Sequence, residues 1–177
     1  DLRMARALAR DCGGAAVRTG LGYDVHRLVP ERPLILGGVR IGDSPLGLLG
    51  HSDADLLAHA VSDALLGAAG LPDIGNLFPA SDEAYRDADS MELLRRVVER
   101  VREERWTVVW VDAVIQAQVP RLNVHLPEMR SRLSALLNPG GPNCVNLKAK
   151  SAEGTGDPGL GGSMTCWASA TLYGAGT

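Results

Sequence analysis

Apolar residues recur along this chain with two different periods, and the shorter period marks the predicted β-strands. The longest β-like run begins at Trp106 and ends before Pro120, which cannot donate a ladder hydrogen bond. An earlier run contains Gly20 and Gly22, which permit a bulge or a close approach of another backbone. The pattern predicts strands at residues 17–28, 34–36, 39–41, 106–118, 145–150 and 164–173.

The longer period, near 3.6 residues, predicts three helices. Ser52 is predicted as the N-cap of the first helix, with Asp55 three residues later as an approximate capping box. A second helix begins near Ser90 and a third near Pro127, a residue favoured in the first helical turn. Residues 73–82 are predicted as a loop. This order predicts an α+β domain in which helices cover one face of a mixed β-sheet.

The composition fits one folded domain and narrows the class of partner. The chain has 177 residues, of which 45% are hydrophobic and 22% charged. A net charge of −3 and an aromatic content of 4% argue against a nucleic-acid surface, which needs basic residues and stacking rings. The three cysteines lack metal-ligand spacing and indicate reduced thiols. No apolar run reaches the roughly 18 residues of a membrane-spanning helix, so we expect a cytoplasmic protein with no membrane partner.

Candidate chemistry lies in two short segments. Asp24 and His26 are two residues apart on a predicted strand and therefore share a face. His59 lies on the predicted helix that follows, four residues after Asp55. If the strand and helix meet, Asp24, His26 and His59 converge as two imidazoles and one carboxylate, which is the ligand set of a catalytic zinc with an open fourth position. Taken singly, these residues also suit a hydrogen-bonded strand pair and an ordinary helix histidine, and Asp55 suits a capping role.

Six blocks in the first 153 residues resemble one enzyme family, the 2-C-methyl-D-erythritol 2,4-cyclodiphosphate synthases. The blocks occur in order and with the spacing of that family. Past residue 153 the resemblance weakens. The blocks are GYDVH at 22–26, HSDADLLAH at 51–59, DIGNLFP at 73–79, DADS at 87–90, QAQVPR at 116–121 and NLKAKSAE at 146–153.

The resemblance implies a reaction of the non-mevalonate isoprenoid pathway. Members convert 4-diphosphocytidyl-2-C-methyl-D-erythritol 2-phosphate to 2-C-methyl-D-erythritol 2,4-cyclodiphosphate and CMP, as homotrimers with active sites between neighbouring subunits. It implies that Asp24, His26 and His59 hold zinc and that Glu153 holds magnesium or manganese. It also implies a bacterial cytoplasmic enzyme, or a plastid enzyme if the source is eukaryotic.

By the same resemblance, further residues take part in the reaction. His51 and Ser151 are assigned to catalysis. Asp73 and Gly75 resemble contacts to the methylerythritol portion, residues 117–122 resemble the cytosine pocket, and Lys150 with Ser151 resembles the contacts to the CMP phosphates. The predicted substrate-binding residues are Ser52, Asp53, Asp73, Ile74, Gly75, Phe78, Asp82, Ala117, Gln118, Val119, Pro120, Arg121, Leu122, Lys150 and Ala152.

Two alternatives and one boundary remain open at this stage. A zinc-dependent phosphoesterase would share the Asp/His/His set, and so would an inactive trimeric metal-binding homologue. Residues 17–177 are predicted as the synthase domain, and residues 1–16 as an N-terminal extension or the remnant of an upstream domain. Residues 1–8 resemble the last helix of a cytidylyltransferase, which predicts a fused or associated cytidylyltransferase in addition to the small-molecule substrate.

Overall fold

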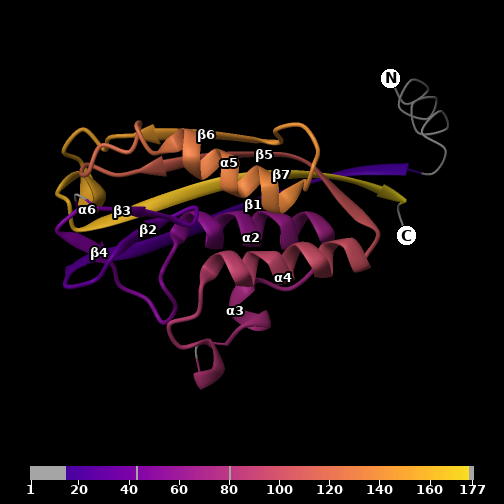
Figure 1. Cartoon of the computed structure of the whole chain (residues 1–177), viewed down its shortest axis with the longest axis horizontal. Helices are drawn as coiled ribbons and strands as arrows, with labels where there is room; N and C mark the ends of the chain where they lie inside the picture. Colours follow the sequence, from indigo (N-terminus) through magenta and orange to yellow (C-terminus); the bar gives the residue numbers. More distant parts are fainter. Residues whose placement is uncertain (1–14, 43, 80, 176–177) are drawn as a thin grey trace.

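The protein is described here by a computed structural model that covers residues 15–42, 44–79 and 81–175. Its main element is a five-stranded sheet in the order β4-β1-β7-β5-β6 (Figure 1). Strands β5 and β6 pair in parallel and the other neighbours are antiparallel, so the sheet is mixed. A separate hairpin is formed by β2 (Leu34–Leu36) and β3 (Val39–Ile41). The sheet strands are β1 (Ala15–Pro30), β4 (Leu46–Leu48), β5 (Trp106–Gln116), β6 (Val145–Lys150) and β7 (Ser163–Ala175).

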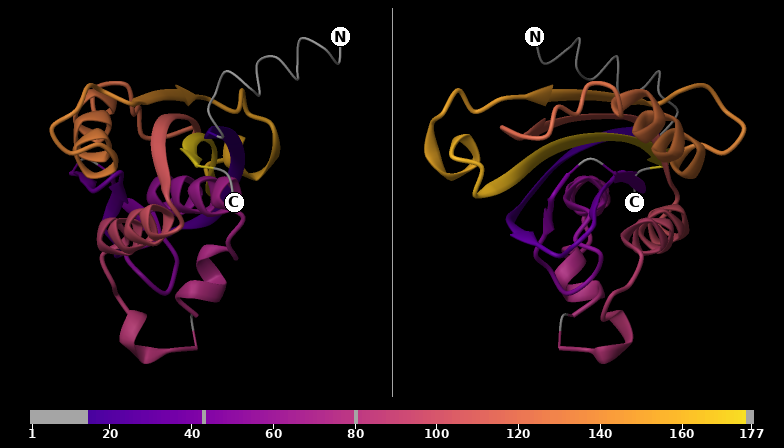
Figure 2. Two further views of the ribbon diagram at one scale, coloured as in Figure 1. Left: turned by 90° about the vertical axis from the view of Figure 1, so that its right-hand side faces the viewer. Right: turned by 60° about the vertical axis from the view of Figure 1, so that its left-hand side comes forward.

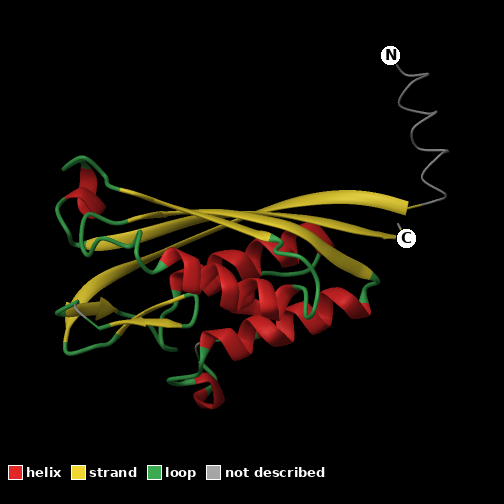
Figure 3. Ribbon diagram, turned by 45° about the horizontal axis from the view of Figure 1, so that its top comes forward, coloured by secondary structure: helices red, strands yellow, loops and turns green. Residues whose placement is uncertain are grey.

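The three long helices lie on one side of this sheet (Figures 2 and 3). Helix α2 packs on β1 and β7, α4 packs on α2, and α5 packs on β6. The predicted α+β class with a mixed sheet is therefore confirmed. Among the described residues, no helix has the length and apolar character needed to cross a membrane. The helices are α2 (Leu56–Ala69), α3 (Ile74–Leu77), α4 (Ser90–Glu103), α5 (Leu126–Leu137) and α6 (Gly156–Gly159), with a 3₁₀ turn, η1, at Glu83–Tyr85.

The sequence pattern missed the shortest elements. Strand β4, helix α6 and turn η1 were not predicted, and α3 lies inside the segment predicted as a loop. Elements of three or four residues span little more than one hydrophobic period, so periodicity alone gives them a weak signal, and β2 and β3 were predicted because a Gly37–Gly38 turn joins them. Residues 1–14, which carry most of the predicted extension, lie outside the described residues.

Two glycines allow β1 to lie directly against α2. A Cβ atom on Gly22 would overlap the carbonyl oxygen of Ala60 and reach 2.7 Å from the backbone nitrogen of Ala64. A Cβ on Gly20 would overlap the carbonyl oxygen of Ala64. The strand and helix backbones are therefore in contact where a side chain would normally separate them. This contact sets the distance between the residues that the two elements carry.

Asp55, and not Ser52, caps helix α2. The carboxylate of Asp55 accepts hydrogen bonds from the backbone nitrogens of Leu57 and Ala58, both at 3.1 Å. It also accepts from Gly37 at 2.9 Å and Gly38 at 2.7 Å, in the turn of the β2–β3 hairpin. The predicted Ser52 cap is wrong because Ala54 has a left-handed φ of 58°, which delays the helix start. The capping role expected of Asp55 is confirmed.

We expect Asp55→Ala to destabilise the metal-free protein by about 3 kcal/mol. Loss of an N-cap costs about 1 kcal/mol, and burying amide donors without partners adds roughly 1–3 kcal/mol. Asp89→Ala is the matched control, because Asp89 caps α4 through a single bond to Met91 from an exposed position. Urea unfolding of both variants tests this. Equal losses of unfolding free energy in the two variants would contradict it.

Candidate metal centre and neighbouring cavities

Asp24, His26 and His59 converge between β1 and α2, as the sequence predicted. The Oδ2 atom of Asp24 lies 3.0 Å from both Nε2 of His26 and Nδ1 of His59. The two imidazole nitrogens are 3.4 Å apart. A tetrahedral zinc with ligand bonds of 2.0–2.2 Å places its ligand atoms about 3.3–3.6 Å apart. These donors therefore form one triangular face of a site that fits such an ion with little movement.

The remaining ring nitrogens of both histidines have hydrogen-bond partners. Nδ1 of His26 donates to the carbonyl oxygen of Leu49 at 2.7 Å. Nε2 of His59 lies 2.9 Å from Oγ of Ser90. Partners of this kind fix which nitrogen faces a metal. Ser90 had no functional role in the sequence analysis, because a hydroxyl 31 positions from its partner leaves no pattern in the chain.

The charges in this cluster support one another. Burial opposes ionisation of Asp24, but hydrogen bonds and charge interactions with His26 and His59 outweigh it and lower the Asp24 pKa well below its usual range. Burial likewise opposes protonation of His26, but Asp24 outweighs it and raises the His26 pKa above 6.5. The Asp24 carboxylate therefore favours the protonated form of the His26 imidazole, so a metal ion must compete with a proton for that side chain.

We expect metal binding to weaken as the pH falls from 8 to 6. Zinc binds neutral imidazole, and the raised pKa of His26 means that proton competition begins above pH 6.5. Below that pKa, one competing proton lowers affinity about tenfold per pH unit. Zinc titration against a chelator of known pH dependence, at pH 8, 7 and 6, measures this. Affinity that does not change with pH would contradict the expectation.

A cavity of about 250 Å³ opens beside the Asp/His/His cluster. Five of its lining residues were predicted to bind substrate or to act in catalysis: His51, Ser52, Ile74, Gly75 and Phe78. The Nε2 atom of His51 is buried without a hydrogen-bond partner in the structure, so it is available to bind a ligand. Sequence reasoning missed two further lining residues, Tyr85 and Leu93.

Three predicted aspartates do not line this cavity. Asp73 and Asp82 are exposed and accept hydrogen bonds at the starts of α3 and η1. The half-buried Asp53 accepts hydrogen bonds from Ser90 and lines a neighbouring cavity of about 770 Å³. Asp63 accepts a hydrogen bond from the backbone nitrogen of Ile74 at 2.8 Å, so it holds α3 against α2.

A separate cavity of about 330 Å³ collects most of the predicted nucleotide contacts at the ends of β5 and β6. Val119, Ala152 and Glu153 are not among its lining residues, although they adjoin it in sequence. Oγ of Ser151 donates to the Glu153 carboxylate at 2.5 Å. The residues that line this cavity are Ala117, Gln118, Pro120, Arg121, Leu122, Asn123, Ala149, Lys150 and Ser151.

The cavity beside the Asp/His/His cluster and the cavity at the ends of β5 and β6 lie on different strands of the sheet. Asp24 pairs with Cys166, Cys166 with Ile115, and Ile115 with Ala149 across the sheet. Three strand spacings separate Asp24 from Ala149, a distance of about 14 Å. The end of β6, from which the segment carrying Ser151 and Glu153 continues, therefore lies three strands away from β1, which carries Asp24 and His26.

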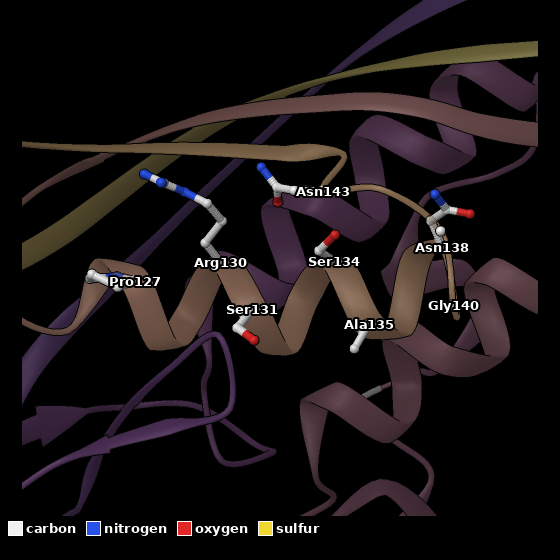
Figure 4. Close-up of a pocket in the computed structure, with 9 residues that line it drawn as sticks. Pro127, Arg130, Ser131, Ser134, Ala135, Asn138, Gly140 and Asn143 are labelled. Atoms are coloured by element: carbon white, nitrogen blue, oxygen red, sulfur yellow. The ribbon is translucent and has the colours of Figure 1, made fainter.

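Another cavity, of about 510 Å³, contains none of the predicted site residues. It lies between α5 and the loop that leads to β6 (Figure 4). Asn138 and Asn143 use their amide groups in local turns, and Ser134 accepts a hydrogen bond from Cys144. Because these polar groups already have partners within the chain, they support the loop.

The fold and the cluster define an α+β protein with a candidate metal centre between strand β1 and helix α2. The chain belongs to the YgbB family, whose model matches residues 17–173.

The chain is similar in sequence and in structure to proteins of known name. It is 49% identical over 152 residues to the 2-C-methyl-D-erythritol 2,4-cyclodiphosphate synthase of Synechococcus sp. strain JA-2-3B'a(2-13), covering 86% of this chain and 96% of the relative. It is also 49% identical over 172 residues to the bifunctional enzyme IspD/IspF of Desulforudis audaxviator, covering 97% of this chain but only 42% of the relative. The solved CDP complex of Plasmodium falciparum IspF has a TM-score of 0.78 and 30% identity, over 91% of this chain and 98% of that one.

Proposed function

We propose that this chain converts 4-diphosphocytidyl-2-C-methyl-D-erythritol 2-phosphate to 2-C-methyl-D-erythritol 2,4-cyclodiphosphate and CMP. The observation that carries the proposal is the triangle of donor atoms from Asp24, His26 and His59 beside a cavity. Relatives named as this synthase support the reaction, and the relative solved with CDP supports a cytidyl substrate.

The reaction needs no nucleophile from the protein. An oxygen of the 2-phosphate attacks the β-phosphorus, a new P–O bond closes the ring, and the bond from the β-phosphorus to the bridging oxygen breaks. CMP leaves with that oxygen and its electron pair. Both phosphates are anionic, so the protein must offset their repulsion. Asp24, His26 and His59 would hold zinc, which would supply Lewis acidity to offset this negative charge.

The residues of the smaller cavity position the reacting groups. His51 offers its free Nε2 as a hydrogen-bond donor to a phosphate oxygen. Ile74, Gly75 and Phe78 lie on and beside α3, where they enclose the methylerythritol portion and exclude water. By resemblance to the family, we also assign Ser52, Asp53, Asp73 and Asp82 to this half of the site, although only Ser52 lines the cavity itself.

The second cavity holds the nucleotide. Residues 117–122 surround the cytosine, whose edge can be read by backbone donors and acceptors, and Lys150 with Ser151 contacts the CMP phosphates. Ala152 adjoins these contacts. Glu153 would hold magnesium or manganese, because carboxylate oxygen is a preferred ligand of such hard cations.

A homotrimer joins the two halves of the site. Since about 14 Å of sheet separates them within a chain, the nucleotide half of one subunit is paired with the zinc half of its neighbour. The sheet face away from the helices supports assembly, because it exposes large apolar side chains. These are Val17, Leu21, Tyr23, Val25, Trp110, Trp167 and Tyr173.

Two further assignments follow from the relatives. The bifunctional relative supports the interpretation of residues 1–16 as the remnant of an upstream cytidylyltransferase domain. The bacterial sources of these two relatives favour a bacterial source for this chain, for which the resemblance implies the cytoplasm and not a plastid.

One reaction separates this proposal from its alternatives. The zinc-loaded protein is incubated with the cytidyl substrate and magnesium, and the products are followed by phosphorus NMR. The proposal expects equal amounts of CMP and cyclic diphosphate. Release of inorganic phosphate would instead favour a zinc phosphoesterase, and no product would favour an inactive homologue.

We expect Glu153→Gln to lower turnover at limiting magnesium about 100-fold while zinc remains bound. The amide keeps the shape but is a poorer ligand for a hard cation, and two decades correspond to roughly 2.7 kcal/mol. Glu31→Gln is the matched control, because Glu31 is also an exposed glutamate with a left-handed φ, 63° against 49° for Glu153. Unchanged turnover in Glu153→Gln would remove Glu153 from the metal site.

A further inference from the structure

Ser90 joins the candidate metal centre to a carboxylate outside it. Its side chain is fully buried at the first position of α4, directly after the cap residue Asp89. Its Oγ lies 2.9 Å from Nε2 of His59 and 2.5 Å from Oδ1 of Asp53. The backbone nitrogen of Ser90 also donates to Asp53, at 3.2 Å. Three elements far apart in the sequence therefore meet at one hydroxyl.

The hydrogen-bonding groups of Asp53, Ser90 and His59 determine which atom donates and which accepts in each bond between them. Ionised carboxylates only accept, so the single hydroxyl proton of Ser90 is donated to Asp53. The Oγ of Ser90 then accepts, and Nε2 of His59 must carry the proton that it donates. Ser52 Oγ lies 3.2 Å from Ser90 Oγ and 3.3 Å from His59 Nε2, and fits as a further donor to Ser90.

A proton on Nε2 of His59 determines the state of the other ring nitrogen, Nδ1. A neutral imidazole with its proton on Nε2 has its lone pair on Nδ1, the atom that lies 3.0 Å from Asp24 within the triangle of donors. The Asp53 charge at the end of the chain also makes the imidazole a stronger donor to a metal. The same contacts fix the orientation of the ring.

We propose that Ser90, backed by Asp53, is the positioning residue that presents Nδ1 of His59 to the metal. This inference rests on the zinc site of the proposed function. It assigns the half-buried Asp53 carboxylate a role in metal affinity, acting through Ser90 and His59, in addition to any contact with substrate.

Zinc affinity of the full chain, measured by chelator competition at pH 7.5, tests the proposal. Ser90→Ala is expected to weaken zinc binding about 10- to 100-fold. Asp53→Asn, which keeps the size and an acceptor oxygen but removes the charge, is expected to weaken it by a smaller factor. Ser90→Thr keeps the hydroxyl and is expected to bind zinc within about threefold of the unmodified chain.

Ser62→Ala is the matched control. Ser62 is also a fully buried serine, on α2, and its hydroxyl donates to the carbonyl of Ala58 instead of contacting His59. Unchanged zinc affinity in both Ser90→Ala and Asp53→Asn would overturn the proposal, and so would equal losses in Ser90→Ala and Ser62→Ala. If the unmodified chain binds no zinc, the proposed metal site itself fails, which is a different result.

Discussion

Replacing His59 with alanine is expected to abolish stoichiometric zinc binding and to lower CMP release about 1,000-fold. His59 supplies one of the three donor atoms, and no other His, Cys, Asp or Glu among the described residues joins that cluster. Lewis-acid stabilisation is worth several kcal/mol, and a loss of roughly 4 kcal/mol corresponds to three decades in rate. Elemental analysis of the purified variant and a CMP assay with the cytidyl substrate measure the two effects.

His51→Ala is the contrasting variant. His51 lines the same cavity, but it lies outside the donor triangle. We expect it to keep about one zinc per chain while turnover falls, because it removes a hydrogen bond to the substrate and leaves the metal ligands intact. Full zinc occupancy in His59→Ala would reject the ligand assignment. Loss of zinc in His51→Ala would reject the division of roles between the two histidines.

Gly22→Ala is expected to destabilise the protein by about 4 kcal/mol or more, a large effect for adding one methyl group. The new Cβ would overlap the backbone of α2 at Ala60, and backbone cannot move aside as a flexible side chain can. If the chain still folds, the helix must shift away from β1. That shift would separate His59 from Asp24 and His26, so zinc affinity should fall as well.

The same substitution at Gly67 provides a control of opposite sign. Gly67 lies on the exposed side of α2, and an added Cβ there would meet only the Leu21 carbonyl oxygen, at an ordinary 3.9 Å. Alanine in a helix interior is favoured over glycine by roughly 0.5–1 kcal/mol, so Gly67→Ala should stabilise the protein. Thermal unfolding of both variants tests the contrast. A Gly22→Ala variant as stable as the unmodified chain would show that β1 and α2 do not need this contact.

Sequence periodicity was sufficient for the long elements and for the convergence of Asp24, His26 and His59. Asp24 and His26 lie on one face of β1 because side chains alternate along a strand, and packing of α2 on that strand brings His59 to them. The sequence did not reveal Ser90, whose role depends on tertiary contacts with Asp53 and His59. It also placed the cap at Ser52, because the left-handed backbone of Ala54 cannot be inferred from an alanine.

The sequence predicted the residues of one cavity more completely than those of the other. The cavity at the ends of β5 and β6 follows two predicted blocks, at 116–121 and 146–153, because most of its lining residues are chain neighbours within one block or the other. The smaller cavity combines residues from β1, α2, α3 and α4, so Tyr85 and Leu93 became part of it only through folding. The exposed positions of Asp73 and Asp82 follow from their roles at the starts of short elements that the pattern could not predict.

The two faces of strand β1 carry different kinds of residue, so the register of β1 against β7 matters for refolding. Gly20, Gly22, Asp24 and His26 face α2, while Leu21, Tyr23 and Val25 are exposed on the opposite face. A one-residue slip of β1 against β7 would exchange the two sets and turn Asp24 and His26 away from His59. If zinc binds the Asp24, His26 and His59 triangle as proposed, it binds only the correct register, so zinc present during refolding should raise the yield of native protein.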